Sequence, residues 1–260
     1  SQDRYNGKEN PNPNTDLGVR PAAYLPPVTN IGDGPSGLLF DPGTGISPKF
    51  RGHFFLCHSK GSYAKSEIHA FTVNEKGSTF ELDQSTPFVS FVHSPDLDVG
   101  PDGAIYFLDW SETMRKTARG RIFKLSDPAV MSDPLTLETK ALLEQGMGKR
   151  SLAELASLLA HTDRRVRMEA QFALATKGTD AAADLANVSS GSNDKVIGGF
   201  KGCTRHDLAR LHAIWGLDQI GQTHKDVYTS LVRLLDDKDS EVRAQATKVL
   251  GNARFAEAKA

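Results

Sequence analysis

Asp96 and Asp98 are the two side chains whose types and spacing most directly suggest chemistry. In an extended strand a spacing of two residues places both carboxylates on one face. Adjacent carboxylates could bind Ca²⁺ or a sugar hydroxyl group. The segment does not complete a calcium-binding loop, because Gly100 stands at the fifth ligand position and Phe107 replaces the bidentate glutamate. Two interpretations stay open, a cation site and a pair of hydrogen-bond acceptors at a strand end, and we favour the second.

Four histidines of the first half could act as metal ligands or general bases: His53, His58, His69 and His93. No H-x-x-x-H or H-E-x-x-H spacing joins any two of them, and these are the spacings that bring histidines together on a helix. The pattern therefore indicates histidines at the surface or at element ends.

Two cysteines, Cys57 and Cys203, are too few for a disulfide framework or a four-thiolate metal site. Cys203 begins the string Cys-Thr-Arg-His, which lacks the second cysteine of a haem-attachment motif, so no covalent haem is expected in this chain. Cys203 and His206 could hold a metal only with ligands from elsewhere, and we interpret them as structural or incidental.

The chain has 260 residues, with 31 basic against 32 acidic side chains and a net charge of −1. No surplus positive charge is available to displace counterions from phosphates, which argues against nucleic acid as a partner. No apolar run approaches the roughly 18 residues that a membrane-spanning helix needs. Because the sequence starts at Ser1 without Met or a signal-like segment, we expect a fragment of a longer protein.

A change in composition divides the chain. All 13 prolines lie at or before Pro134, whereas alanine is concentrated after residue 150. Proline interrupts helices and alanine favours them. The first 20 residues are polar and rich in Asn, Gly and Pro, which indicates an irregular arm. A β architecture should therefore precede an α architecture, with the junction between residues 127 and 150.

Short alternating runs separated by turn residues fill residues 35–125 and predict strands. The clearest pair is Asp96–Val99 and Ala104–Trp110, joined by Gly-Pro-Asp-Gly. Pro101 presets its own φ and Gly103 tolerates a positive φ, so a hairpin is expected. Few runs leave room for an intervening helix, and the sheets should be antiparallel.

After residue 150 the apolar period becomes 3.6 residues and a repeat is visible. Arg167, Arg210 and Arg243 recur at intervals of 43 and 33 residues, close to the spacing of HEAT-like helix pairs. We expect these arginines, together with Arg164 and Arg165, to pair at the surface with the preceding aspartate, Asp163 or Asp239. Six apolar positions should face inward: Val166, Ala170, Leu211, Ile214, Val242 and Ala246.

Several long strings carry a family resemblance: GPSGLLFDPGTGISPKFRGHFFLCHSKG, DLDVGPDGAIYFLDW and GRIFKL, then LLAHTDRRVRMEAQFAL, ARLHAIWGL and EVRAQATKVLG. The first three resemble late blades of soluble quinoprotein sugar dehydrogenase propellers. All six, in this order, resemble the secreted "membrane-bound dehydrogenase" proteins of planctomycetes and verrucomicrobia. In those proteins HEAT repeats follow the propeller, and a cytochrome c module often follows the repeats.

The resemblance implies a chain of two architectures, partial antiparallel β-propeller blades followed by a HEAT-type α-solenoid. Its expected divisions are an irregular arm at 1–20, the last blades of the propeller at 21–127, a linker at 128–150 and HEAT-like repeats at 151–260.

The resemblance also suggests cofactor-binding residues. Lys60 stands near the position of a lysine that contacts pyrroloquinoline quinone (PQQ) in the family, and His58 and His93 lie at comparable blade positions. Two family arginines are absent, because the matching stretch here is His93-Ser-Pro95-Asp96. PQQ and Ca²⁺ are therefore expected in the full-length protein and not on this chain alone.

Two hypotheses of function follow. The first is part of a secreted quinoprotein-like oxidoreductase of a sugar or alcohol, located in the periplasm or outside the cell. Its catalytic blades and haem module would lie outside this chain, so the remaining blades or other chains and a cytochrome c are its expected partners. The alternative is a non-catalytic propeller and HEAT scaffold that binds carbohydrate or protein.

Overall fold

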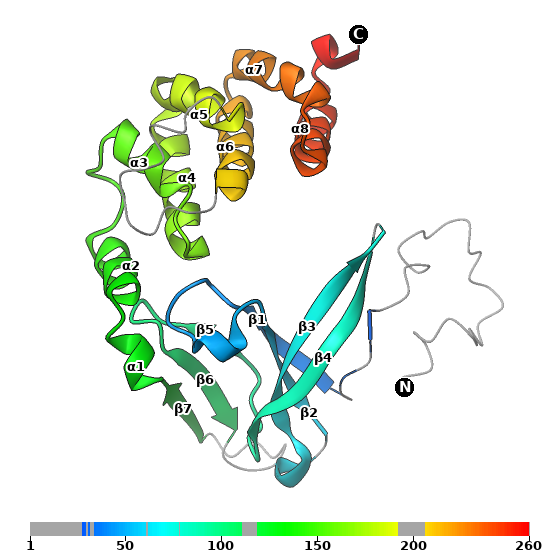
Figure 1. Ribbon diagram of the computed structural model, residues 1–260, viewed down its shortest axis with the longest axis vertical. Coiled ribbons are helices and arrows are strands. Elements are labelled where there is room, and N and C mark those ends of the chain that lie inside the picture. The colour runs from blue at the N-terminus through cyan, green and yellow to red at the C-terminus, as the bar shows by residue number, and fades with distance from the viewer. Residues whose placement is uncertain are drawn as a thin grey trace, which may run out of the picture. The chain divides into compact units, whose positions relative to one another are not determined.

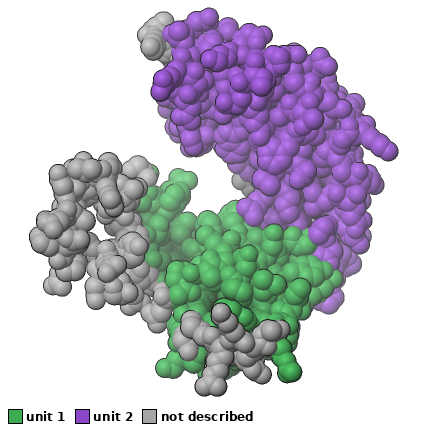
Figure 2. All heavy atoms as spheres, turned by 180° about the vertical axis from the view of Figure 1, so that it is seen from behind, with its two compact units in different colours: residues 1–41, 46–100, 104–126 green, residues 42–45, 101–103, 127–260 purple. Residues whose placement is uncertain are grey.

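A computed structural model describes residues 28–29, 31, 34–60, 62–77, 79–110, 119–191 and 206–259. The described chain is mixed α/β and divides into two compact units, coloured separately in Figure 2. Unit 1 holds the described parts of 1–41, 46–100 and 104–126. Unit 2 holds 42–45, 101–103 and the described parts of 127–260. The predicted arm at 1–20 lies outside the described residues.

The first sheet of unit 1 is an antiparallel meander in the order β1-β2-β3-β4 (Figure 1). Its strands are β1 (Gly34–Phe40), β2 (Phe54–Ser59), β3 (Glu67–Lys76) and β4 (Thr79–Ser90). Short 3₁₀ turns, η4 (Pro48–Phe50) and η5 (Tyr63–Lys65), lie in the first two connections. The prediction of antiparallel strands is confirmed.

The second sheet has the order β5-β6-β7, with β5 (Leu97–Val99), β6 (Ile105–Trp110) and β7 (Gly120–Leu125). Val99 pairs with Ile105 across the Gly-Pro-Asp-Gly turn, and Gly103 has a φ of 81°. This conformation is easily reached only without a Cβ atom, so the hairpin and its physical reason are both confirmed.

Most buried residues lie on one face of each sheet and come from β1, β2, β3, β5 and β6, whereas β4 and β7 contribute none. The opposite face carries exposed apolar side chains. The buried faces share a core whose largest members include Phe55, Ile68 and Phe107. On the opposite faces Leu38 is 58% exposed and Ile122 is 71% exposed. Within the described chain, therefore, each sheet has an apolar face that is not fully covered.

Unit 2 is helical, and its bounds are α1 (Pro128–Met131), α2 (Pro134–Gln145), α3 (Leu152–Leu158), α4 (Arg164–Thr176), η6 (Gly178–Ala181), α5 (Ala182–Ser189), α6 (His206–Gly221), η7 (Lys225–Tyr228), α7 (Thr229–Val232), η8 (Arg233–Asp236), α8 (Ser240–Ala253) and η9 (Ala256–Lys259). The stretch expected as a linker, 128–150, contains α1 and α2. Asp127 and Asp133 are the N-caps of α1 and α2, and a proline follows each of them at the first helical position. Proline is favourable at this position, so a segment that contains two prolines can still be helical.

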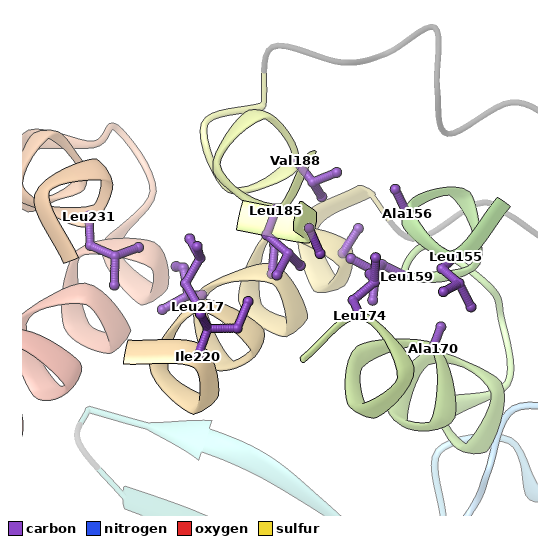
Figure 3. Close-up of a cluster of buried hydrophobic side chains, with 14 of the residues drawn as sticks. Leu155, Ala156, Leu159, Ala170, Leu174, Leu185, Val188, Leu217, Ile220 and Leu231 are labelled. Atoms are coloured by element: carbon purple, nitrogen blue, oxygen red, sulfur yellow. The ribbon is translucent and has the colours of Figure 1, made fainter. Parts of the chain in front are cut away.

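A continuous apolar core runs through unit 2. Figure 3 shows Leu155, Leu174, Leu185 and Leu217 lying along it, from α3, α4, α5 and α6. Five of the six positions expected inward are buried, with Ile214 fully so, and Leu211 is half-buried. The periodicity therefore predicted this core correctly.

The arginine pairing predicted from sequence is wrong for Arg167 and Arg243. Arg167 Nη1 donates to the carbonyls of His161 and Thr162, at 2.6 and 2.8 Å. Arg243 Nη1 donates to the carbonyls of Asp237 and Lys238, at 2.6 and 3.0 Å. The preceding aspartates, Asp163 and Asp239, accept helix N–H groups as N-caps.

Arg210 and Arg165 do form ion pairs. Arg210 pairs with Asp237 and also donates from Nε to the carbonyl of Ser189 at 2.9 Å. Arg165 pairs with Asp163 at 2.8 Å. The predicted pairing is thus confirmed for Arg165, which contacts Asp163. Arg210 also pairs with an aspartate, but with Asp237, which was not the predicted partner.

A buried polar network links α4 to α6. Arg167 Nε donates to His212 Nε2 at 3.3 Å, so the neutral imidazole carries its proton on Nδ1 and donates it to Gln171 Oε1 at 2.7 Å. Burial, and secondarily the Arg167 charge, lowers the pKa of His212 to about 4. This histidine is therefore neutral at physiological pH.

In the part of the chain that the structure describes, no closed barrel or propeller is formed. None of the helices described there has both the length and the apolar character needed to cross a membrane.

Candidate functional site

The strongest cluster of reactive side chains lies on β2 and β3. His58 and Glu67 are direct cross-strand partners, and His69 follows Glu67 by two residues on β3. Directly opposed residues share a face of the sheet, as do residues two apart on one strand. Local pairing therefore brings all three side chains to the same face.

Their polar atoms converge on one carboxylate oxygen. Glu67 Oε1 is 3.5 Å from His58 Nε2 and 3.0 Å from His69 Nε2. Lys60 Nζ also lies 3.0 Å from this oxygen. His58, Glu67 and His69 each offer a ligand atom within 4.8 Å of the other two, the one such trio found among the described residues. We call these three residues the His–Glu–His cluster.

The cluster is largely removed from water. The His58 side chain is fully buried, and those of His69 and Glu67 are 13% and 16% exposed. Burial opposes ionisation of Glu67, but hydrogen bonds from His69 and Lys60 outweigh it and lower the pKa of the carboxyl group. Glu67 is accordingly a carboxylate at neutral pH, available to an imidazole, an ammonium group or a metal ion.

Strand β4 adds a partner and an irregularity. His69 Nδ1 lies 3.0 Å from Ser85 Oγ, which directs the other ring nitrogen towards Glu67. The pairing of β3 with β4 shifts register between Ile68 and His69, where His69 stands opposite Pro87. Proline has no N–H to give to the ladder, and such bulges commonly re-aim a side chain beside a functional site.

An apolar pocket of about 380 Å³ lies on the same sheet face. Its wall includes Leu56, the cross-strand partner of His69, and Pro35, the partner of His58. Phe54, Phe71 and other apolar residues extend it along the sheet. The polar cluster therefore adjoins an apolar surface.

Of the cofactor-binding residues predicted from sequence, the structure brings Lys60 and His58 together and places His93 elsewhere. His93 is buried, and its ring contacts Trp110 edge-on with 5.8 Å between ring centroids. Its main-chain N–H donates to Asp109 at 3.0 Å. His93 thus packs beside Asp109 and Trp110 instead of joining Lys60.

Asp96 and Asp98 are exposed, and the residues that alternate with them are buried, as their spacing predicted. Asp96 Oδ1 accepts from the N–H of Leu97 at 2.9 Å, and Asp98 Oδ1 accepts from Val99 at 2.7 Å. Among the residues described, they form no metal-binding trio with a third histidine, cysteine or carboxylate. These contacts agree with the hydrogen-bond-acceptor interpretation.

Cys57 and Asp109 have structural surroundings. Cys57 is buried, lies 3.3 Å from Ser94 Oγ, and burial raises its pKa to about 11, so it is a protonated and unreactive thiol. The buried Asp109 pairs with Arg121 at 2.6 Å and accepts from Tyr63 at 3.1 Å. Cys203 lies outside the described residues, and so does the side chain of His206.

Sequence reasoning missed Glu67 and misjudged His69 as a surface residue. The available signal was Glu-x-His in a strand with a period of two, beside a second strand that holds His58 near its end. A search for helical histidine spacings does not detect it, because a sheet assembles ligands across strands.

Comparison with known proteins adds no relative: no family model, curated protein or solved structure matches this chain.

Proposed function

We propose that this chain is part of a secreted quinoprotein-like oxidoreductase that acts on a sugar or an alcohol. Its two sheets are blades of a β-propeller, and unit 2 is a HEAT-type repeat that follows them. The blades that bind the cofactor and the haem module belong to other parts of the protein. The family resemblance of the sequence suggests this function, and the two-faced character of the sheets is the structural observation that carries it.

Each sheet has the surface expected of a propeller blade. In β6 and β7 the second face presents Leu108, Trp110 and Ile122, which are 43%, 48% and 71% exposed. In β1 it presents Leu38 and Phe40, at 58% and 36%. A propeller blade is covered by a neighbouring blade on each side, so apolar residues on both faces become buried only in the complete ring.

The repeated role of arginine supports the helical part of the proposal. Arg167 in α4 and Arg243 in α8 each stand four residues after an N-cap aspartate. Each arginine donates to the carbonyls of the two residues immediately before that aspartate. Equivalent contacts at equivalent positions are what stacked repeats produce.

In this proposal PQQ and Ca²⁺ bind mainly to other blades, in the periplasm or outside the cell, and electrons pass to a cytochrome c. Lys60 contributes to the wall of the proposed PQQ pocket, with its ammonium group held by Glu67 at 3.0 Å. This chain alone should retain neither cofactor.

The test is a dye-linked dehydrogenase assay on the full-length gene product, reconstituted with PQQ and Ca²⁺ and supplied with aldoses and primary alcohols. We expect substrate-dependent reduction of the dye that requires PQQ. Absence of turnover with every substrate, together with retained binding to a carbohydrate or protein, would overturn the proposal in favour of the scaffold.

A second measurement tests the blade interpretation. Ile122→Lys should prevent folding or assembly of the full-length protein, because the side chain is covered there by the next blade. The matched exposed variant Lys76→Ile, on the β3 strand, should not (its side chain is 66% exposed). Equal tolerance of both substitutions would contradict the proposed blade contact.

A further inference from the structure

We propose that the His–Glu–His cluster binds a divalent transition-metal ion of the zinc class. The inference concerns residues of this chain alone and does not depend on the proposed oxidoreductase function.

The separations of the ligand atoms match those around such an ion. A metal about 2.1 Å from each donor holds neighbouring donors roughly 3.0–3.4 Å apart, for angles between 90° and tetrahedral. Glu67 Oε1 lies 3.0 Å from His69 Nε2 and 3.5 Å from His58 Nε2. The ligand nitrogens of His58 and His69 lie within 4.8 Å of each other. Small rotations of the two side chains would bring this remaining distance into the same range. The strands therefore hold the donors close to coordination geometry.

The donor set selects the class of metal. Two imidazoles and one carboxylate suit Zn²⁺, Co²⁺, Ni²⁺, Fe²⁺ or Cu²⁺, whereas Ca²⁺ and Mg²⁺ favour oxygen donors. Three protein ligands leave at least one coordination position for water or a substrate atom. Next to the cluster lies the apolar pocket that Leu56 and Pro35 help to line.

Ser85 supplies the supporting contact that metal-bound histidines usually have. It lies 3.0 Å from His69 Nδ1, and it accepts that N–H when Nε2 faces the metal. His58 and Glu67 lie on paired strands, so their backbones are fixed relative to one another by the ladder. Two ligands are thus positioned by pairing and the third is oriented by a neighbour.

Lys60 sets the strength of binding. Its ammonium group lies 3.0 Å from the same Glu67 oxygen that the metal would use. A bound dication must displace this group or share the carboxylate with it, and like charges repel. Removing the charge should therefore strengthen metal binding, an effect opposite to that of removing a ligand.

The experiment titrates the full chain, freed of metal by a chelator, with Zn²⁺ alone by calorimetry and with Co²⁺ alone by visible absorption. We expect one ion per chain and cobalt bands typical of coordination by nitrogen and oxygen. Glu67→Gln and His69→Gln should each weaken binding at least tenfold, and Ser85→Ala about tenfold. Lys60→Met should tighten it about tenfold, and the control His53→Gln should leave it unchanged.

Circular dichroism and thermal unfolding check that each variant is folded. If a ligand variant does not fold, Lys60→Met and Ser85→Ala still test the site, since they change affinity in opposite directions. The proposal is overturned if neither the natural chain nor Lys60→Met binds one ion, in which case Lys60 is the cluster's own cation. It is also overturned if Glu67→Gln binds as tightly as the natural chain, or if Ca²⁺ binds as tightly as Zn²⁺.

Discussion

The two units of this protein differ in how far they bury their large apolar side chains. In unit 2 most large apolar residues of α3 to α8 form one cluster, with Leu155, Ile214 and Leu231 fully buried, although Met168 and Phe172 of α4 are each 43% exposed. In unit 1 most buried residues lie on one face of each sheet, β4 and β7 bury none, and Leu38, Leu108 and Ile122 are exposed on the other face. Unit 2 thus completes its core with its own residues, while unit 1 carries apolar surface suited to further contacts.

The buried polar side chains of the two units also differ in the contacts that they make. In unit 2 the buried Arg167 bonds two carbonyls and His212, which secures a helix start and a helix pair. In unit 1 His58, His69 and Lys60 converge on a single carboxylate beside an apolar pocket. A buried polar group that is fully engaged stabilises a fold, whereas several groups sharing one acceptor can exchange it for a ligand. Chemistry is therefore expected in unit 1 and stability in unit 2.

Two isoleucines allow the largest test of this comparison. Ile214 in α6 is fully buried and Ile122 in β7 is 71% exposed. Ile214→Asp buries an uncompensated carboxylate and should cost about 4 kcal/mol or more, while Ile122→Asp in this chain should cost less than about 1 kcal/mol.

The two tryptophans make the measurement specific. Trp110 lies in β6 and Trp215 in α6, so urea unfolding followed by fluorescence in Trp110→Phe or Trp215→Phe backgrounds reports each unit separately. Similar losses for both substitutions would contradict the claim that the second face of the β5-β6-β7 sheet is solvent-exposed in this chain.

Acid should weaken unit 2 through His212. The unfolded histidine takes up a proton near pH 6.5, whereas the folded one stays neutral until its pKa of about 4. The stabilising contribution is therefore complete above pH 6.5 and is lost as the pH falls towards 4, by up to about 3 kcal/mol. Burial also lowers the pKa of His161. Protonation of this histidine in the unfolded chain should therefore reduce stability at acid pH as well.

Stability measured against pH by Trp215 fluorescence checks this expectation. His212→Gln keeps an acceptor for Arg167 and a donor for Gln171 but cannot titrate, so its stability should depend less on pH over the same range. An unchanged pH dependence in this variant would assign the effect to other groups.

The sequence predicted the fold wherever a repeating pattern had one physical cause. Alternation predicted antiparallel strands, Gly103 the hairpin, and the 3.6-residue period the inward position of Ile214. The contacts of Arg167 and Arg243 were not predicted. The sequence shows that these side chains are charged, but it does not show which group accepts their hydrogen bonds. Arg167 bonds main-chain carbonyls, which every residue possesses.

The candidate site was only half predictable. Lys60 and His58 were suggested by the family resemblance as PQQ contacts, the metal ligands were expected at Asp96 and Asp98, and Glu67 acquires its role from cross-strand register. Register depends on which strands pair and where their bulges lie, and the alternation of apolar residues shows neither the partner strand nor the bulge between Ile68 and His69. His69 was misjudged for the same reason, since it is β4 that supplies Ser85.

The arginine contacts themselves provide the third test. Arg167 is 7% exposed and bonds two carbonyls and His212, whereas Arg243 is half-buried and bonds two carbonyls. Arg167→Gln should cost about 2 kcal/mol and Arg243→Gln about 1 kcal/mol, because more buried acceptors lose a partner in the first. Urea unfolding of both variants, read from Trp215, gives the comparison. Costs below about 0.5 kcal/mol for both would restore the interpretation of these arginines as surface groups.

The smallest expected effect lies in the polar contacts of unit 1 that are away from the His–Glu–His cluster. Tyr63 donates to Asp109 at 3.1 Å and accepts from Arg121 at 2.8 Å, while Arg121 keeps two bonds of its own to Asp109. Tyr63→Phe should therefore cost only about 0.5–1 kcal/mol, the value of a hydrogen bond whose partners remain satisfied. Unfolding followed by Trp110 fluorescence, with and without Arg121→Met, measures the cost and the coupling. A loss above about 2 kcal/mol would mean that unit 1 depends on a cooperative polar network, and the contrast with unit 2 would then be one of apolar burial alone.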